Sequence, residues 1–259
     1  MKNNKIWFKI LLIAIIGILD LQMASGEINL PTNNREYGPL EINSNCLDNL
    51  ILGNPLTGLS FSTLNENYKS TEIYRKFISA KSQNENVVGW ITIPNTLTDN
   101  AIMFNKDNEF YLHRNENGEW SKNGSIFIDS TSGGKFSDIN LIHGHNMKSG
   151  LMFGELDKYK DENFTKTNRE FEIARSGSVD KYRIYSVFIA DGNSERFDVR
   201  FDNQKRYREY FKTLGERSMF KLDYKKKDLN EIIMLNTCSY EFSNAHLIIC
   251  AYREKINEE

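Results

Sequence analysis

Cysteine is scarce in this chain, and its few copies lie far apart. The 259 residues include three cysteines, Cys46, Cys238 and Cys250. None of them belongs to a C-x-x-C pair, which argues against a zinc ribbon or a thioredoxin-type redox motif. Because the count is odd, at least one thiol takes part in no disulfide within the chain.

The sequence also lacks a basic excess and any recognisable cofactor motif. It has 33 Lys and Arg against 35 Asp and Glu, and its formal net charge is -2. This balance gives no indication of nucleic-acid binding. No nucleotide, flavin or metal motif is present, so we expect no cofactor. A hydrophobic content of 39% and a mean hydropathy of -0.54 fit a soluble globular body rather than a polytopic membrane protein.

Long apolar runs are missing except at the N-terminus. Lys2, Lys5 and Lys9 precede residues 10–19, which carry no charge. Basic residues before an apolar run are typical of a secretory signal or a signal anchor. The run is short for a membrane span of ~20 residues, but it lengthens if Lys9 snorkels. Small residues at 24–26 also permit cleavage, so both outcomes stay open; we favour an anchor in the cell membrane with the remainder outside.

The chain divides into three predicted parts. Residues 1–26 form the signal anchor or signal peptide, residues 27–66 form an extracellular spacer, and residues 67–259 form the folded domain. Apolar spacing predicts a helix at 68–80 and another at 204–214. Runs of β-branched and aromatic residues, separated by Gly-containing turns, predict many short strands. These lie at 87–93, 101–104, 125–128, 139–143, 171–174, 181–190, 231–237 and 246–252. The pattern favours a mixed, mostly antiparallel β-barrel or sandwich with flanking helices.

The two C-terminal cysteines have different surroundings. Cys238 ends the strand-type run 231–237, whose last residues, Asn236 and Thr237, are polar. This pattern suits a strand that leaves the core and opens onto a cleft. Cys250 lies inside an apolar strand, and we expect it to be a core thiol.

A nucleophilic thiol needs an imidazole to share its proton, and the chain has only four histidines. His145 follows a predicted strand within H-G-H-N, where Gly144 permits a sharp turn, and Asp129 or Asp138 could orient it. A zinc site is the alternative, because His143 and His145 could face one side of a strand. A third ligand would then come from Cys238 or an acid. Both interpretations stay open at this point.

Five blocks of sequence, taken in order, resemble those of the class B sortases, the membrane-anchored cysteine transpeptidases of Gram-positive bacteria. The similarity runs from about residue 68 to residue 252. The blocks are V-V-G-W-I-T-I-P at 87–94, D-N-E-F-Y-L-H-R at 107–114, N-G-E-W-S-K-N-G-S-I-F-I-D at 117–129, G-H-N-M-K-S-G-L-M-F at 144–153 and L-N-T-C at 235–238.

The resemblance implies a fold, a reaction and partners. The fold would be a closed β-barrel of about eight strands with N-terminal helices. Cys238 would attack a C-terminal sorting motif of a secreted protein, often of the N-P-x-T or P-x-T-G kind, with His145 as acid/base partner. A thioacyl enzyme would form, and an amine of peptidoglycan or of a pilin would resolve it. Asn236, Thr237 and Glu241 flank the thiol and are our candidates for substrate contact.

Three positions depart from the family pattern. Met234 stands where the family has Thr, His143 where it has an aromatic residue, and His246 where it has an essential Arg. Arginine is always charged and offers several donors, whereas a neutral histidine offers one. We do not expect Arg253 to take over, since strand alternation places it on the opposite face from His246. The alternative function is therefore a catalytically impaired, sortase-like peptide-binding module.

Overall fold

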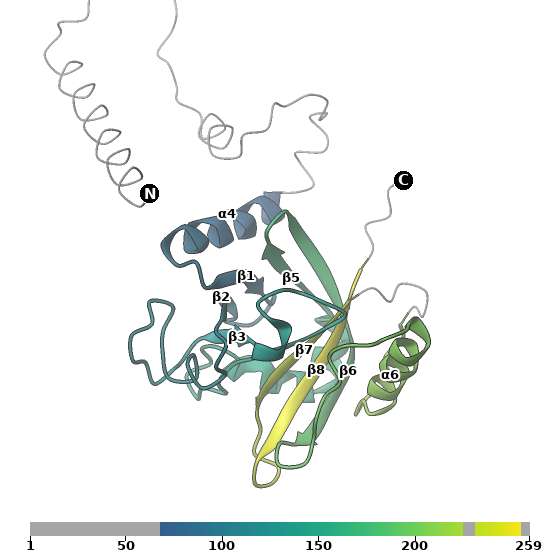
Figure 1. Cartoon of the computed structure of the whole chain (residues 1–259). Coiled ribbons are helices and arrows are strands. Elements are labelled where there is room, and N and C mark those ends of the chain that lie inside the picture. The colour runs from purple at the N-terminus through teal and green to yellow at the C-terminus, as the bar shows by residue number, and fades with distance from the viewer. Residues whose placement is uncertain (1–67, 225–230, 255–259) are drawn as a thin grey trace, which may run out of the picture. The chain divides into compact units, whose positions relative to one another are not determined.

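The computed structural model describes residues 68–224 and 231–254, and eight strands close into a barrel in the order β1-β2-β3-β4-β7-β8-β6-β5 (Figure 1). The strands are β1 (Val87–Thr92), β2 (Asp99–Phe104), β3 (Ile126–Ile128), β4 (Ile139–His143), β5 (Glu170–Arg175), β6 (Ser178–Asp191), β7 (Ile232–Cys238) and β8 (Ala245–Arg253). The helices are α4 (Tyr68–Gln83), α5 (Glu162–Thr167) and α6 (Gln204–Glu216), with 3-10 turns η1 (Ser130–Ser132) and η2 (Gly154–Lys160).

Every predicted strand is present, and the sheet closes as a barrel rather than dividing into a sandwich. β2 pairs with β3 and β4 pairs with β7 in parallel, while the other neighbouring strands are antiparallel. A parallel pair cannot be joined by a tight hairpin. The chain therefore makes a long excursion between β4 and β7, through which β5, β6 and α6 are inserted.

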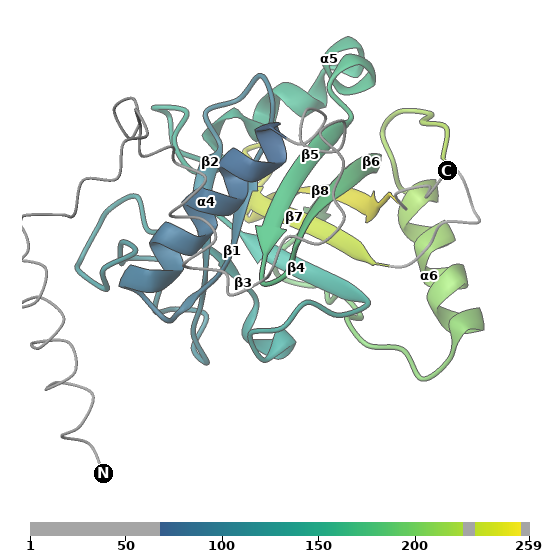
Figure 2. The ribbon, with the colours of Figure 1, turned by 90° about the horizontal axis from the view of Figure 1, so that it is seen from above.

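Two helices cover separate parts of the barrel's outer surface, as Figures 1 and 2 show. In α4, Ile73 and Phe77 are four residues apart and buried against β1 and β2, as the helical spacing predicts. In α6, Tyr207 and Phe211 are buried against the outer face of β6 and β8. Both predicted helices are thus confirmed, and the aromatic residues of α6 belong to the core.

β7 and β8 are apolar on both faces because each face meets its own core. Ile233, Leu235 and Leu247 point into the barrel, where they join the interior cluster. Met234 and Ile248 point outward, where they join the cluster under α6. Strands that are buried on both faces usually have continuous apolar sequences. The polar residues Asn236 and Thr237 near the end of β7 are therefore exceptions.

The prediction missed the helical turns between β4 and β5. The side chain of Asp161 caps α5 by accepting a hydrogen bond from the amide of Phe164 at 2.7 Å. An Asp before a short polar helix is a usual N-cap signal. The weak apolar periodicity of α5 explains why this helix was not predicted, since only Thr165 of α5 is buried.

The predicted segments 1–26 and 27–66 lie outside the described residues. Within residues 68–224 and 231–254, no helix combines the length and apolarity needed to cross a membrane.

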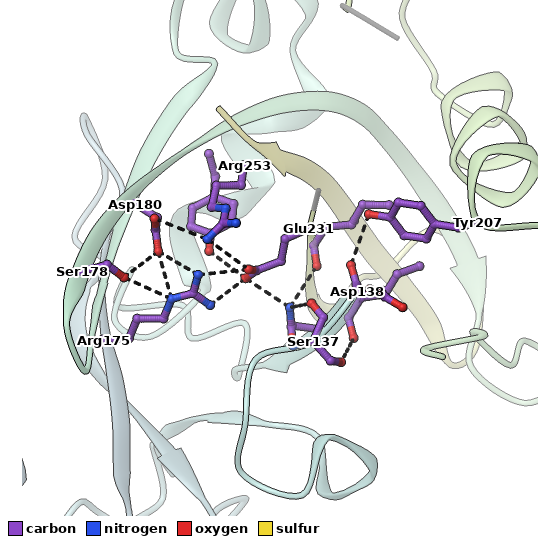
Figure 3. Close-up of polar contacts among 12 residues, drawn as sticks. Ser137, Asp138, Arg175, Ser178, Asp180, Tyr207, Glu231 and Arg253 are labelled. Atoms are coloured by element: carbon purple, nitrogen blue, oxygen red, sulfur yellow. Dashed lines mark hydrogen bonds and ion pairs between the residues drawn. The ribbon is translucent and has the colours of Figure 1, made fainter. Parts of the chain in front are cut away.

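A buried ionic network joins the strands at the end of β7 remote from Cys238 (Figure 3). Glu231 receives two hydrogen bonds from Arg175, at 2.9 and 3.0 Å, and one from the hydroxyl of Tyr182 at 2.8 Å. Arg253 lies 3.7 Å from the same carboxylate. Glu231 is only 6% exposed, so its charge depends on these partners.

We expect Glu231→Gln to destabilise the fold by roughly 1–3 kcal/mol, because the Arg175 guanidinium loses one of its two carboxylate partners and keeps only Asp180, at 2.8 Å. The measurement is the free energy of unfolding in urea at pH 7. Glu170→Gln is the matched control, since Glu170 pairs with Arg183 at 2.6 Å on the surface. The control should cost less than about 1 kcal/mol. Equal costs for the two variants would contradict the structural role given to the network.

Candidate active site

The pairing of β4, β7 and β8 gathers the sequence-predicted residues at one end of the barrel. In the parallel β4–β7 pair, His143 lies opposite Asn236. In the antiparallel β7–β8 pair, Cys238 lies opposite His246. Residues opposite one another on neighbouring strands have Cβ atoms about 4.5–5.5 Å apart, so these side chains are near neighbours.

The two described thiols are as different as their sequences indicate. Cys238 is the last residue of β7 and is exposed. Cys250 is fully buried, and burial raises the pKa of its thiol. Of these two thiols, only Cys238 is accessible to a substrate and able to act as a nucleophile in solution.

His145 lies just beyond β4, at the strand exit that its sequence predicts. Its Nε2 donates to the carbonyl oxygen of Leu112 at 2.7 Å, and its ring stacks on His113 with centroids 6.0 Å apart. Gly144 is needed here, because a Cβ at this position would lie 2.7 Å from the ring of Phe153. No pattern in the sequence indicates that Leu112 and His113 would contact His145.

The residue after His145 connects this turn to the thiol. The side-chain amide nitrogen of Asn146 donates to the carbonyl oxygen of Cys238 at 2.9 Å and to the carboxylate of Asp157 at 3.0 Å. Thr237, which is buried, donates its hydroxyl proton to the carbonyl oxygen of Gly144 at 2.7 Å. These contacts hold the β4 exit against the end of β7, so His145 and Cys238 lie at neighbouring strand ends.

A second row of polar side chains runs across β4, β7 and β8. The ring of His143 contacts Asp129 through Nε2 at 3.0 Å and the amide nitrogen of Asn236 through Nδ1 at 3.1 Å. The amide oxygen of Asn236 contacts Nδ1 of His246 at 2.7 Å. We call this row, Asp129–His143–Asn236–His246, the polar relay. The sequence draws attention to all four members for separate reasons, but it does not connect them.

Charges at the two ends of the polar relay are controlled in opposite ways. Burial would raise the pKa of Asp129, but hydrogen bonds from His143 and Thr131 outweigh it and hold that pKa well below its usual range. Burial, reinforced by the nearby His143, lowers the pKa of His246. Asp129 is therefore a carboxylate at neutral pH, and His246 is mainly a neutral imidazole.

The structure differs from two further expectations, that Asp129 orients His145 and that His143 and His145 share a zinc ion. Asp129 contacts His143 instead of His145, so it does not orient the predicted partner of the thiol directly. Both ring nitrogens of His143 are occupied by protein groups, which leaves none for a metal shared with His145. Within the described part of the chain, no group of three His, Cys, Asp or Glu side chains could hold a metal ion.

The three residues expected to contact a substrate have distinct positions. Asn236 is 9% exposed and belongs to the polar relay. Thr237 is buried under the β4 exit. Glu241 lies in the loop after Cys238, where it pairs with Lys160 at 2.7 Å and so ties that loop to η2. Their contact with a substrate stays a prediction.

Arg253 and three other arginines that could in principle replace the family residue are engaged elsewhere. Arg253 belongs to the ionic network of Glu231. Arg114 donates to the carbonyl oxygen of Gly118 and lies over the ring of Phe110. Arg196 and Arg200 donate to the carbonyl oxygens of Glu195 and Thr131, respectively.

Comparison with known sequences identifies relatives of one kind. No protein-family model matches the chain. It is 33% identical over 159 residues to sortase B of Listeria monocytogenes, a match that spans 61% of this chain and 65% of that protein, just under two thirds of its length. It is 22% identical over 185 residues to sortase B of Staphylococcus aureus, spanning 70% of this chain and 76% of that protein.

Comparison with solved structures finds relatives of the same kind. The sortase B of Clostridium perfringens is 33% identical, with a TM-score of 0.63 over 69% of this chain and 99% of that one. The sortase B of Bacillus anthracis in complex with AAEK2 is 26% identical, with a TM-score of 0.64 over 77% of this chain and 99% of that one. A sortase B–substrate complex of S. aureus, at 21% identity and a TM-score of 0.64, shares the fold.

We expect Asp129→Asn to lower the free energy of unfolding at pH 7 by about 1–3 kcal/mol, since the partly buried ring of His143 loses a charged acceptor. The pKa of Asp129 is lowered in the folded state, so its contribution is present above the unfolded pKa of 3.8 and is lost as the pH falls below it. The difference between wild type and variant should therefore shrink below about pH 4.

Urea unfolding at pH 7 and pH 3 tests this expectation. Asp138→Asn is the control, because Asp138 is exposed and its side chain has no hydrogen bond or ion pair in the described structure. A difference between wild type and Asp129→Asn that stayed constant down to pH 3 would contradict the assignment of this charge to Asp129.

Proposed function

The chain belongs to the class B sortase family, and on that basis we propose that it is a cysteine transpeptidase in which Cys238 is the nucleophile and His145 its acid/base partner. The substrate would be a C-terminal sorting motif of a secreted protein. The acceptor would be an amine of peptidoglycan or of another surface polymer. One observation carries the proposal: an exposed thiol ends β7, and the neighbouring exit of β4, which holds His145, is hydrogen-bonded to the backbone of that residue.

The reaction follows from what these groups can do. The sulfur of Cys238 attacks the scissile carbonyl carbon, and the peptide C–N bond breaks as His145 delivers a proton to the leaving amine. The product is a thioester on Cys238. The acceptor amine then attacks that thioester, the C–S bond breaks, and the thiol is regenerated. A new amide bond replaces the old one, so the exchange needs no cofactor.

The setting of His145 supports an acid/base role. Because a carbonyl oxygen can only accept, the contact with Leu112 places a proton on Nε2 of His145. A neutral ring then has a free lone pair on Nδ1 and can take a second proton there. The stacked His113 and the hydrogen bond to Leu112 restrict ring rotation, which favours a fixed geometry for proton transfer.

The N-terminal sequence supports a membrane location. Three lysines before an apolar run suit a single anchor, and the polar segment 27–66 suits a spacer between membrane and enzyme. The folded domain would then face the cell wall, where both the secreted substrate and the acceptor amine are found.

A peptide-binding module is the second candidate, and the polar relay favours it. His246 stands where the family has an arginine, and its Nδ1 is engaged by Asn236. A site short of one oxyanion donor would bind the motif but react on the order of a hundredfold more slowly, or worse. The two candidates differ in whether a thioacyl adduct accumulates.

We expect the full-length chain, incubated with peptides of the N-P-x-T and P-x-T-G kinds, to gain the mass of the acyl fragment. Cys238→Ala should abolish the adduct, because the other described thiol is buried. Intact-protein mass spectrometry is the measurement, and Cys250→Ala is the matched control that should keep the adduct. An adduct that persists in Cys238→Ala would refute the assigned nucleophile, and peptide binding without any adduct would favour the binding module.

A further inference from the structure

The polar relay has a direction, and Asp129 sets it. A carboxylate can only accept hydrogen bonds, so Nε2 of His143 must carry the proton in their 3.0 Å contact. In a neutral His143 the other nitrogen, Nδ1, is then an acceptor. The amide nitrogen of Asn236 donates to it, which turns the amide oxygen of Asn236 toward His246.

The same argument determines which ring nitrogen of His246 carries the proton. Because the oxygen of Asn236 can only accept, Nδ1 of His246 must be the donor in their 2.7 Å contact. Nε2 of His246 has no hydrogen-bond partner in the described structure. The Nε2 edge of the ring lies against Gly192, where a Cβ would come within 2.7 Å of it. His246, which lies opposite Cys238 in the β7–β8 pair, thus keeps Nδ1 engaged, while its Nε2 edge faces Gly192 just beyond the end of β6.

This arrangement limits what a neutral His246 can offer. A neutral imidazole has one N–H, and Asn236 already takes it. The ring can donate to a substrate only after Nε2 gains a second proton, and the charge then adds to the strength of the bond. Both protonation states keep Nδ1–H directed at Asn236, so the relay holds the ring in one orientation throughout.

We propose that Asp129, His143 and Asn236 are positioning residues that hold His246 so that its protonated Nε2 is the cationic donor to the substrate oxygen, which makes thioacyl formation acid-activated. The inference rests on the proposed function of Cys238. In the step concerned, the sulfur bonds to the carbonyl carbon and the carbonyl π pair moves onto oxygen. That oxyanion accepts the Nε2–H hydrogen bond, and no proton leaves His246.

The groups around His246 are consistent with a site that responds to pH. On β7 it faces Asn236 and the thiol of Cys238, and beyond them His143 on β4. On β6 its neighbours are Ala190 and, at the strand end, Asp191, whose carboxylate is engaged by Asn193 and Ser194. Burial lowers the pKa of His246, so the charged form becomes abundant only on the acid side of neutrality.

The first test compares wild type with His246→Arg, which is charged at every pH used. The measurement is the rate of thioacyl-adduct formation on the full-length chain between pH 7.5 and 5.5. The ratio of the wild-type rate to the His246→Arg rate cancels the ionisation of the thiol and of His145. We expect this ratio to rise about tenfold per pH unit from 7.5 to 6.5, because the rate follows the protonated fraction of His246. A ratio that is flat or that falls toward acid pH would overturn the proposal.

The second test separates positioning from a general structural role. Asn236→Leu keeps the approximate volume but cannot accept from His246. Its loss of rate at pH 6, about tenfold or more, should appear in the wild-type background and largely vanish in the His246→Arg background. Equal losses in the two backgrounds would mean that Asn236 supports the strand rather than His246.

The third test needs no catalysis, so it distinguishes failure of this inference from failure of the proposed function. In the full-length chain, labelled with ¹⁵N at its histidines and solubilised in detergent, long-range ¹H–¹⁵N spectra at pH 7.5 should show His246 protonated at Nδ1. Asn236→Leu should remove that preference. A wild-type ring protonated at Nε2 would overturn the relay, whatever the activity. If the ring is protonated at Nδ1 but no variant forms an adduct, the proposed transpeptidase function has failed while the relay stands.

Discussion

The parallel pairing of β4 with β7 is the constraint on which the rest of this structure depends. It joins two segments about ninety residues apart in sequence, and its register sets His143 against Asn236. The exits of the two strands then lie side by side. His145 follows one strand and Cys238 ends the other, so a single sheet contact places the two residues at neighbouring strand ends. A shift of one residue would turn either side chain to the other face.

The long connection that this pairing requires also supplies the cover of the outer sheet face next to the site. Because parallel neighbours cannot be linked by a hairpin, β5, β6 and α6 are placed between them in the chain. β6 then pairs with β8, and α6 covers the outer face with Tyr207 and Phe211. The apolar cover ends where the polar relay begins. The outer face of β7 and β8 therefore carries apolar side chains under α6 and polar side chains toward Cys238.

The two ends of β7 show two uses of buried charge. At one end Glu231 is fully paired with Arg175 and tied to Tyr182, an arrangement that fastens strands together and leaves no group free. At the other end Asp129 accepts hydrogen bonds from His143 and Thr131, and its influence passes through His143 and Asn236. The first network contributes to the fold, whereas the second ends on a half-buried ring at the candidate site.

Much of the architecture followed from the sequence, because apolar periodicity is a local property. The eight strands, helices α4 and α6 and the different settings of Cys238 and Cys250 were all predicted. The short α5 was not, since capping by Asp161 rather than an apolar face defines it. The departures at His143 and His246 were also visible, but as two unrelated oddities.

The sequence by itself determined the strands, the core thiol and the strand-end positions of Cys238 and His145, because each depends on neighbours along the chain. Only the tertiary structure decided that Asp129 bonds to His143 rather than His145, that Leu112 accepts from His145, and that Asn236 joins two histidines into one relay. These contacts cross between strands and loops. Their partners are set by sheet register, a property of the closed barrel that no single segment encodes.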